Sequence, residues 1–227
     1  MTATIDRKDR KGKRRVFIVD DHPAVQEGLA TVVNQQRDLE ICGAAGSARE
    51  AMERIAGLKP DLVIIDLSLQ DGNGLELIKD LHARDHKLPL LVLSMHDEAL
   101  YAERVLHAGA GGYVMKKEPM NVLLGALRHV LDGEVYLSEP LKAKIVGFHV
   151  GRAHPVIQSP VELLSDRELE VFELTGQGLG TREVADRLKL SMKTVSCYRQ
   201  SIKSKLALKN GTELTRQAIH WVEAHGA

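Results

Sequence analysis

Five short apolar segments, each followed by a stretch with helical spacing, constrain the fold of this chain more than any other feature. The segments are VFIVD, LEICG, DLVIID, LPLLVLS and GGYVMK, all between positions 16 and 116. Their hydrophobicity is continuous rather than alternating, which is typical of strands that are buried on both faces of a parallel sheet. The stretches between them repeat apolar residues at helical intervals, so the pattern predicts successive strand–helix units.

Five helices are expected between and after these strands. Ser47 and Glu50 form a capping box at the start of the second helix, and Gly109 and Gly133 end the fourth and fifth. The expected ranges are Ala24–Asn34, Ser47–Gly57, Leu75–Arg84, Ala99–Ala108 and Met120–Leu131. Five strands alternating with five helices predict an α/β domain over residues 15–132, with a doubly wound parallel sheet.

The rest of the chain differs from this domain in composition. Residues 1–14 are polar, basic and without periodicity, and predict a disordered basic tail. Residues 133–160 contain Pro140, Pro155 and Pro160. They predict a linker, with one short helix over Leu141–Phe148.

Residues 161–227 predict a small all-α domain of four helices. Ser165 and Glu168 form a capping box, and Thr181, Ser191 and Thr212 are expected to open the next three helices. The second and third helices read as a helix-turn-helix, in which the second helix enters the major groove of DNA. The formal net charge of the chain is zero, yet residues 187–209 hold seven Lys or Arg residues and no acid. This local excess predicts a polyanionic partner.

Cysteine usage and hydropathy exclude several classes of protein. The two cysteines, Cys42 and Cys197, lie far apart, which fits neither a disulfide framework nor a zinc site. No apolar run approaches 18 residues and the first residues are charged, so we expect neither a membrane span nor a signal peptide. These features predict a cytoplasmic protein.

Polar residues fall where the predicted strands end. Asp20 and Asp21 follow the first strand, Asp66 the third, Ser94 the fourth and Lys116 the fifth. Ligands of a doubly wound sheet bind at the carboxyl ends of its strands. Three carboxylates together repel one another unless a cation balances them, and oxygen ligands suit Mg²⁺.

The same residues carry a chemical hypothesis. Asp66, in the middle of the group, is the candidate nucleophile for an aspartyl phosphate. Lys116 would hold the oxygens of the phosphoryl group, and Ser94 could donate a hydrogen bond to one of them. A lone Asp at a strand end is often only a turn residue, but three Asp, one Ser and one Lys on the same edge favour a functional site.

Four sequence motifs of the chain resemble those of a known family. FIVDDHP, DLVIIDLSLQDGNGLELI, LVLSMH and AGAGGYVMKKEP are similar to the receiver domain of bacterial two-component response regulators, over about Arg15–Leu131. The resemblance implies a flavodoxin-like (βα)5 fold and phosphorylation of Asp66 by a sensor histidine kinase. It implies that Asp21, Asp66 and the backbone carbonyl of Ser68 bind Mg²⁺ while Asp20 assists through water. It also implies that Ser94 and Tyr113 act as a switch pair, with Tyr113 moving inward on phosphorylation.

The C-terminal domain resembles the LuxR-type DNA-binding domain over Leu163–Val222. The resemblance rests on the Leu-Ser-x-Arg-Glu opening, the turn at Gly178 and the closing KSKLALKN. Receiver and helix-turn-helix together are similar to the NarL/FixJ class. The resemblance and the basic helix implicate these residues in contacts with double-stranded DNA: Lys193, Thr194, Ser196, Cys197, Tyr198, Arg199, Gln200, Lys203 and Lys205. Arg199, Lys203 and Lys205 would favour phosphates.

We therefore expect a DNA-binding transcription regulator that is not an enzyme and that forms a homodimer. One alternative is a phosphohydrolase that works through an aspartyl phosphate. It would normally need a second Asp two positions after the nucleophile, where this chain has Ser68. The other alternative is a regulator whose first domain dimerises without phosphorylation.

Overall fold

The structure, a computed structural model, describes residues 12–69, 72–143 and 160–225. The chain divides into two compact units, Met1–Leu141 and Lys142–Ala227. Most of the predicted tail and residues 144–159 of the predicted linker lie outside the described residues.

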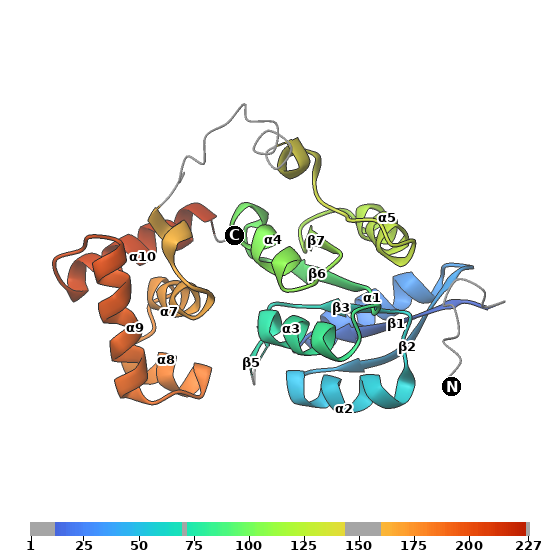
Figure 1. The fold of residues 1–227 in the computed structure, drawn as a ribbon, viewed down its shortest axis with the longest axis horizontal. Coiled ribbons are helices and arrows are strands. Elements are labelled where there is room, and N and C mark those ends of the chain that lie inside the picture. Colours follow the sequence, from blue (N-terminus) through green and yellow to red (C-terminus); the bar gives the residue numbers. More distant parts are fainter. Residues whose placement is uncertain (1–11, 70–71, 144–159, 226–227) are drawn as a thin grey trace. The chain divides into compact units, whose positions relative to one another are not determined.

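The first unit is built on a five-stranded parallel sheet with the strand order β2-β1-β3-β6-β7 (Figure 1). The strands are β1 (Arg14–Val19), β2 (Leu39–Ala45), β3 (Leu62–Ile65), β6 (Leu90–Ser94) and β7 (Gly112–Met115). Each of the five predicted apolar segments supplies one strand. This is the strand order of flavodoxin-like sheets, so the predicted fold is confirmed.

Helices cover both faces of this sheet. They are α1 (Pro23–Asn34), α2 (Ala48–Leu58), α3 (Gly74–Arg84), α4 (Glu98–His107) and α5 (Met120–Leu131). Leu29 of α1 and Leu127 of α5 share one core with Val16, Ile64 and Leu91 of the sheet. Burying each such side chain contributes about 1.5–3 kcal/mol, which fixes the register of strands and helices.

Local hydrogen bonds from side chains determine where the helices begin. The Ser47 side chain accepts from the Glu50 amide at 3.2 Å, which is one half of the predicted capping box, while the Glu50 carboxylate accepts from the Gly46 amide at 3.1 Å. Asn73 caps α3 and Asp97 caps α4 in the same way. The loop after Asp66 was not expected to contain strands, yet β4 (Ser68–Leu69) and β5 (Gly72–Asn73) pair antiparallel.

The segment after α5 differs from the predicted linker. Tyr136 pairs with Gly112 at the edge of the sheet, and Leu137 and Leu141 are buried. Residues 139–143 are helical, and the remainder of the helix predicted over Leu141–Phe148 lies outside the described residues. Residues 134–141 therefore belong with the first unit, because they bury apolar side chains and complete backbone hydrogen bonds there.

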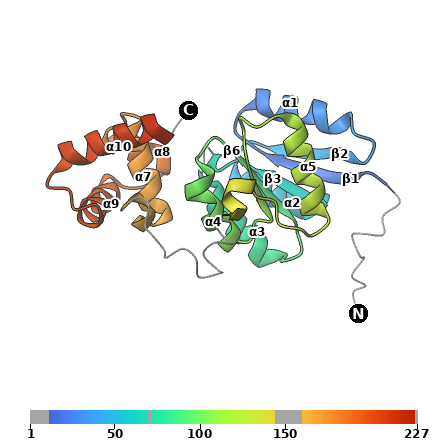
Figure 2. The same ribbon diagram turned by 90° about the horizontal axis from the view of Figure 1, so that it is seen from above.

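The second unit is helical, and its helices α7 to α10 lie together in Figure 2. A short 3₁₀ turn, η2 (Pro160–Leu163), precedes α7 (Asp166–Gly176), α8 (Thr181–Leu188), α9 (Met192–Lys205) and α10 (Gly211–His225). Phe172, Val184, Val195, Ile202 and Leu214 are buried between them. The four predicted helices are confirmed, and each begins within one residue of its predicted start after the capping residue.

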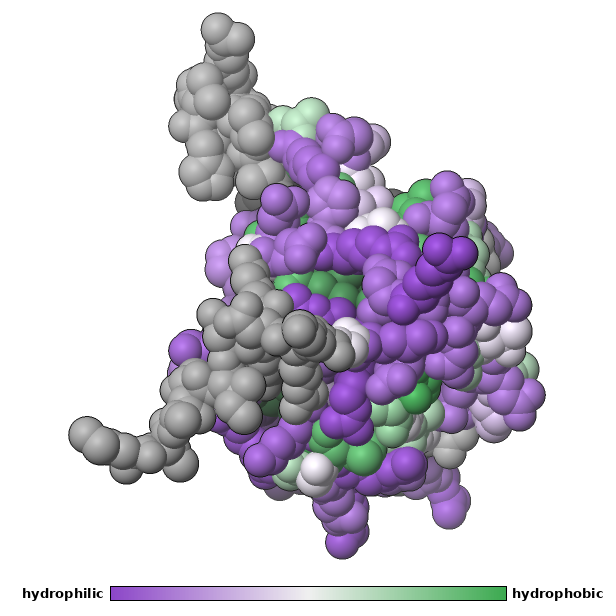
Figure 3. Space-filling model, turned by 90° about the vertical axis from the view of Figure 1, so that its right-hand side faces the viewer, coloured by the Kyte–Doolittle hydropathy of each residue, from purple (hydrophilic) through white to green (hydrophobic). Residues whose placement is uncertain are grey.

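The described helices include none that is long and apolar enough to cross a membrane. Figure 3 shows one face on which hydrophilic residues predominate and apolar residues form separate patches.

Candidate functional site

The backbone of the sheet brings Asp66 to the carboxyl edge of the strands. Its amide donates to the Val19 carbonyl at 2.8 Å, which continues the ladder between β1 and β3. Gly74, the first residue of α3, lies so close that a Cβ there would be 2.2 Å from the Asp66 carbonyl oxygen and 2.7 Å from Leu67 Cα. Only glycine fits this contact without displacing the loop that carries Asp66.

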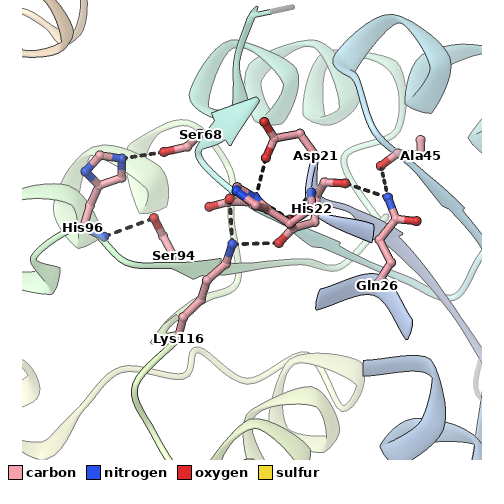
Figure 4. A network of polar contacts seen from close by, with 10 residues as sticks. Asp21, His22, Gln26, Ala45, Ser68, Ser94, His96 and Lys116 are labelled. Atoms are coloured by element: carbon pink, nitrogen blue, oxygen red, sulfur yellow. Dashed lines mark hydrogen bonds and ion pairs between the residues drawn. The ribbon is translucent and has the colours of Figure 1, made fainter. Parts of the chain in front are cut away.

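Lys116 joins two of the acids at the centre of the pocket (Figure 4). Its Nζ lies 2.7 Å from Asp20 Oδ2 and 2.8 Å from Asp66 Oδ2. Asp20 and Asp66 are 2% and 3% exposed, so these carboxylates depend on protein groups for their hydrogen bonds. The His22 amide also donates to Asp20 Oδ1, at 2.9 Å.

This environment changes the acidity of both partners. Burial raises the pKa of Asp66, and the hydrogen bond and charge of Lys116 offset only part of that shift. Burial would lower the pKa of Lys116, but its hydrogen bonds to Asp20 and Asp66 raise it above its ordinary value. At neutral pH the lysine is therefore a firmly protonated cation.

Asp21 and His22 lie beside this pair at the rim of the pocket. His22 Nδ1 is 2.7 Å from Asp21 Oδ1 and 3.3 Å from Asp20 Oδ1. Asp20, Asp21, His22 and Asp66 can each place a ligand atom within 4.8 Å of the others. Asp21 Oδ1 is buried and has no hydrogen-bond partner among the described residues. An orphaned carboxylate oxygen beside two further carboxylates fits a divalent cation such as Mg²⁺.

A second group of residues flanks Asp66 on the side of β6. The Ser94 hydroxyl accepts from the His96 amide at 3.3 Å, and the Tyr113 hydroxyl donates to the His96 carbonyl at 2.8 Å. The His96 ring contacts the Ser68 hydroxyl at 2.9 Å. Tyr113 is already buried, at 1% exposure, and so occupies the inward position that was expected only after phosphorylation.

Sequence reasoning missed the two histidines at this edge. The motifs and strand ends in the sequence did not single out His22 or His96. The position of His22 next to two acids was the available signal. His96 follows the end of its strand by two residues, and no rule of spacing indicated its contact with Ser68.

In the second unit, Ser191 caps α9 and accepts from the Thr194 amide at 3.0 Å. The side chains implicated in DNA contacts divide into two groups. Lys193, Ser196, Cys197 and Gln200 are exposed, and Thr194, Tyr198 and Lys203 are partly exposed. These seven residues lie outside the buried face formed by Val195 and Ile202.

Arg199 and Lys205 make polar contacts within their own domain. The Arg199 guanidinium contacts Thr175 Oγ1 at 3.3 Å and Thr215 Oγ1 at 3.4 Å, and burial lowers its pKa. Lys205 Nζ lies 2.6 Å from Glu168 Oε2. Both cations contact side chains of their own domain, and their expected role on DNA phosphates stays a prediction.

Both domains of the chain match known protein families. Residues 16–128 match the response regulator receiver domain, and residues 162–218 match the LuxR family of bacterial regulatory proteins. The oxygen regulatory protein NreC of Staphylococcus haemolyticus is 34% identical over 209 residues, which cover 90% of this chain and 96% of that protein. The chain belongs to the response regulators with a LuxR-type DNA-binding domain. NreC of Staphylococcus aureus (strain JH9) matches over the same shares, also at 34% identity.

Solved structures agree with this family. RcsB from Salmonella enterica serovar Typhimurium, bound to the promoter P1flhDC in the presence of the phosphomimetic BeF3−, is 26% identical with a TM-score of 0.67. The match covers 91% of this response regulator and 98% of that chain. A second structure of Salmonella typhimurium RcsB is 27% identical with a TM-score of 0.71, and covers 92% and 98% of the two chains.

The family settles the general function. This response regulator is a DNA-binding transcription regulator, and its receiver domain implies a histidine kinase as partner. Receiver domains bind Mg²⁺ at the phosphorylation site, where this chain has the acidic cluster of Asp20, Asp21 and Asp66. Members of the family are typically not enzymes.

Proposed function

We propose that Asp66 accepts the phosphoryl group and that its phosphorylation controls DNA binding by the C-terminal unit. One observation carries this proposal: Asp66 lies at the carboxyl edge of the sheet with Lys116 at 2.8 Å and Asp20 on the same lysine. A carboxylate oxygen of Asp66 attacks phosphorus, the bond from phosphorus to the donor breaks, and the donor leaves with its electron pair. Lys116 then neutralises oxygens of the transferred group.

A divalent cation is part of the proposal. Asp21, Asp66 and the backbone carbonyl of Ser68 would hold Mg²⁺, with Asp20 assisting through water. The ion supplies positive charge that screens the approaching phosphoryl group. Ser94 lies buried at the end of β6, where its hydroxyl oxygen accepts from the His96 amide, and its O–H would donate to a phosphoryl oxygen.

DNA contacts are proposed for the seven exposed or partly exposed residues of α9. Lys193 and Lys203 would contact phosphates, while Thr194, Ser196, Cys197, Tyr198 and Gln200 would face the groove. Arg199 and Lys205 instead hold α9 against its own domain. A homodimer would place two such helices on successive half-sites, and this would occur in the cytoplasm beside the DNA.

The domain boundaries are proposed as a basic tail over residues 1–14, a receiver domain from 15, and a DNA-binding domain from about 161. The contacts of Tyr136 and Leu141 extend the receiver beyond 132.

Asp66→Asn tests the phosphorylation site. Acetyl phosphate with Mg²⁺ should add one phosphoryl group to the wild type, seen by intact-protein mass, and none to the variant. Asp80→Asn, at an exposed position on α3, is the matched control and should still be labelled. Labelling of Asp66→Asn at the wild-type rate would contradict the proposal, and sustained release of phosphate from small phosphoesters would favour the phosphohydrolase alternative.

A further inference from the structure

We propose that His22 is a nitrogen ligand of the divalent cation held beside Asp21, and that its imidazole raises the affinity of the pocket for transition-metal ions relative to Mg²⁺. This inference rests on the proposed function, because that function places a cation in this pocket.

The separations between donor atoms fit a shared ion. His22 Nδ1 is 2.7 Å from Asp21 Oδ1 and 3.3 Å from Asp20 Oδ1. Two ligands at neighbouring positions of an octahedral ion, each about 2.1 Å from it, lie about 3.0 Å apart. His22 Nδ1 and Asp21 Oδ1 are therefore spaced about as two neighbouring ligands of one ion would be.

The contact between His22 and Asp21 also lacks the proton or metal cation that would make it favourable. Asp21 Oδ1 has no hydrogen-bond partner among the described residues although Nδ1 is 2.7 Å away, so the ring does not donate to it in good geometry. The Asp21 side chain is 5% exposed, which keeps most water from it. Two electron-pair donors this close are favourable only when a proton or a metal cation lies between them.

The fold depends little on the His22 side chain, so this side chain is available to bind a cation. The side chain is 64% exposed. His22 occupies the N-cap position of α1 without making a side-chain cap hydrogen bond, and the helix starts instead with Pro23 at its first turn. Alanine at position 22 should therefore leave the fold intact.

The chemistry of the His22 imidazole predicts which metal ions the site prefers. Mg²⁺ prefers oxygen ligands. Imidazole suits first-row transition ions, whose affinity for a mixed nitrogen and oxygen site rises from Mn²⁺ to Co²⁺ and beyond. Removing the ring should weaken Co²⁺ binding by about tenfold and change Mg²⁺ binding by no more than about twofold.

The experiment uses the full-length protein with Mn²⁺ as a paramagnetic probe. Electron spin echo envelope modulation should show coupling to a directly bound ¹⁴N in the wild type and in His129→Ala. His129 is a matched control, because its ring lies on α5 beside Tyr136 and is not part of the cluster of Asp20, Asp21 and Asp66. The coupling should vanish in His22→Ala, and Co²⁺ and Mg²⁺ titrations of both variants should give the affinity ratios. Thermal melts confirm that His22→Ala is folded.

The outcomes separate the two proposals. Bound Mn²⁺ without ¹⁴N coupling in the wild type, or unchanged coupling in His22→Ala, would overturn the role of His22 and leave the cation site standing. Binding of Mg²⁺ and Mn²⁺ that is unaffected by Asp21→Asn would instead overturn the cation site itself.

Discussion

Lys116 Nζ lies 2.8 Å from Asp66 Oδ2, so the candidate phosphoacceptor already has a cationic partner before any phosphoryl group arrives. The same ammonium group lies 2.7 Å from Asp20 Oδ2. Together with Asp21, the pocket holds three carboxylates and one ammonium, which leaves two negative charges uncompensated when all four are ionised. A divalent cation would balance this residual negative charge. The lysine and the metal would therefore both stabilise the same group of carboxylates.

Lys116→Met should destabilise the receiver domain in the absence of divalent ions. The change leaves two buried carboxylates without their shared cation, and we expect a loss of about 2–3 kcal/mol in the free energy of unfolding. Added Mg²⁺ should recover part of this loss, because it supplies positive charge to the same carboxylates. Urea denaturation followed by circular dichroism, with and without Mg²⁺, measures both effects.

Lys117→Met is the control for this prediction, since Lys117 is the next residue and is exposed. It should unfold like the wild type under both conditions. Equal stability of Lys116→Met and the wild type without Mg²⁺ would show that the ion pair does not stabilise the fold.

Asp66→Asn should alter the pH dependence of stability in a defined direction. Burial raises the pKa of Asp66 in the folded state, so the native protein binds this proton more tightly than the unfolded chain. The contribution of the carboxyl is therefore favourable below its unfolded pKa and is lost as the pH rises through its folded pKa. Without Mg²⁺, the stability of Asp66→Asn relative to the wild type should rise as the pH is increased from about 4. A difference in urea denaturation that does not change with pH would contradict the prediction.

The sequence was sufficient for the fold and for the composition of the pocket, because parallel strands carry their terminal residues to one edge. It could not show that Lys116 pairs with both Asp20 and Asp66, since spacing along the chain does not fix which side chains meet. The contacts of Arg199 with Thr175 and Thr215 could have been anticipated from its place on α9. It lies four residues after Val195 and three before Ile202, which puts it on the buried face of α9.

The close contact at Gly74 predicts a strong effect of a single methyl group. Gly74→Ala would place a Cβ against the Asp66 carbonyl and Leu67 Cα, which are backbone atoms that cannot rotate away. We expect a loss of about 1–3 kcal/mol in stability and slower phosphorylation of Asp66, because the loop must shift. Gly57→Ala in α2 meets nothing within 4 Å and should instead stabilise by about 0.5–1 kcal/mol. Chemical denaturation and acetyl phosphate labelling of both variants decide this.

Glu168 should stabilise the fold of the DNA-binding domain. Its carboxylate accepts from the Ser165 amide, the Ser201 hydroxyl and Lys205 Nζ, each at 2.6 Å, and it is 4% exposed. Burial alone would raise its pKa, but these hydrogen bonds lower it to about 2. Because the folded pKa is depressed, its stabilisation is present above the unfolded value of about 4.5 and is lost as the pH falls toward 2.

Glu168→Ala should therefore cost about 2–3 kcal/mol at neutral pH, since three donors lose their acceptor. Trp221, the single tryptophan of the chain, lies 5.8 Å from Phe172 in this unit, so its fluorescence reports unfolding of the DNA-binding domain. The variant should also lose the acid-sensitive part of its stability below about pH 4.5. An acid transition identical to that of the wild type would exclude Glu168 as its source.

Arg199 and Lys193 should respond differently to alanine, although both are cations on α9. Lys193 is exposed, and a lysine that contacts a DNA phosphate releases about one counterion, so Lys193→Ala should reduce the slope of log affinity against log salt by about 1 on any duplex. Arg199 is held by Thr175 and Thr215, so Arg199→Ala should lower the unfolding midpoint seen by Trp221 fluorescence and leave the salt slope unchanged. Fluorescence anisotropy with labelled DNA at several salt concentrations separates the two effects. A reduced slope for Arg199→Ala at a temperature where it is fully folded would return Arg199 to the DNA interface, because a purely internal side chain cannot change the number of counterions released.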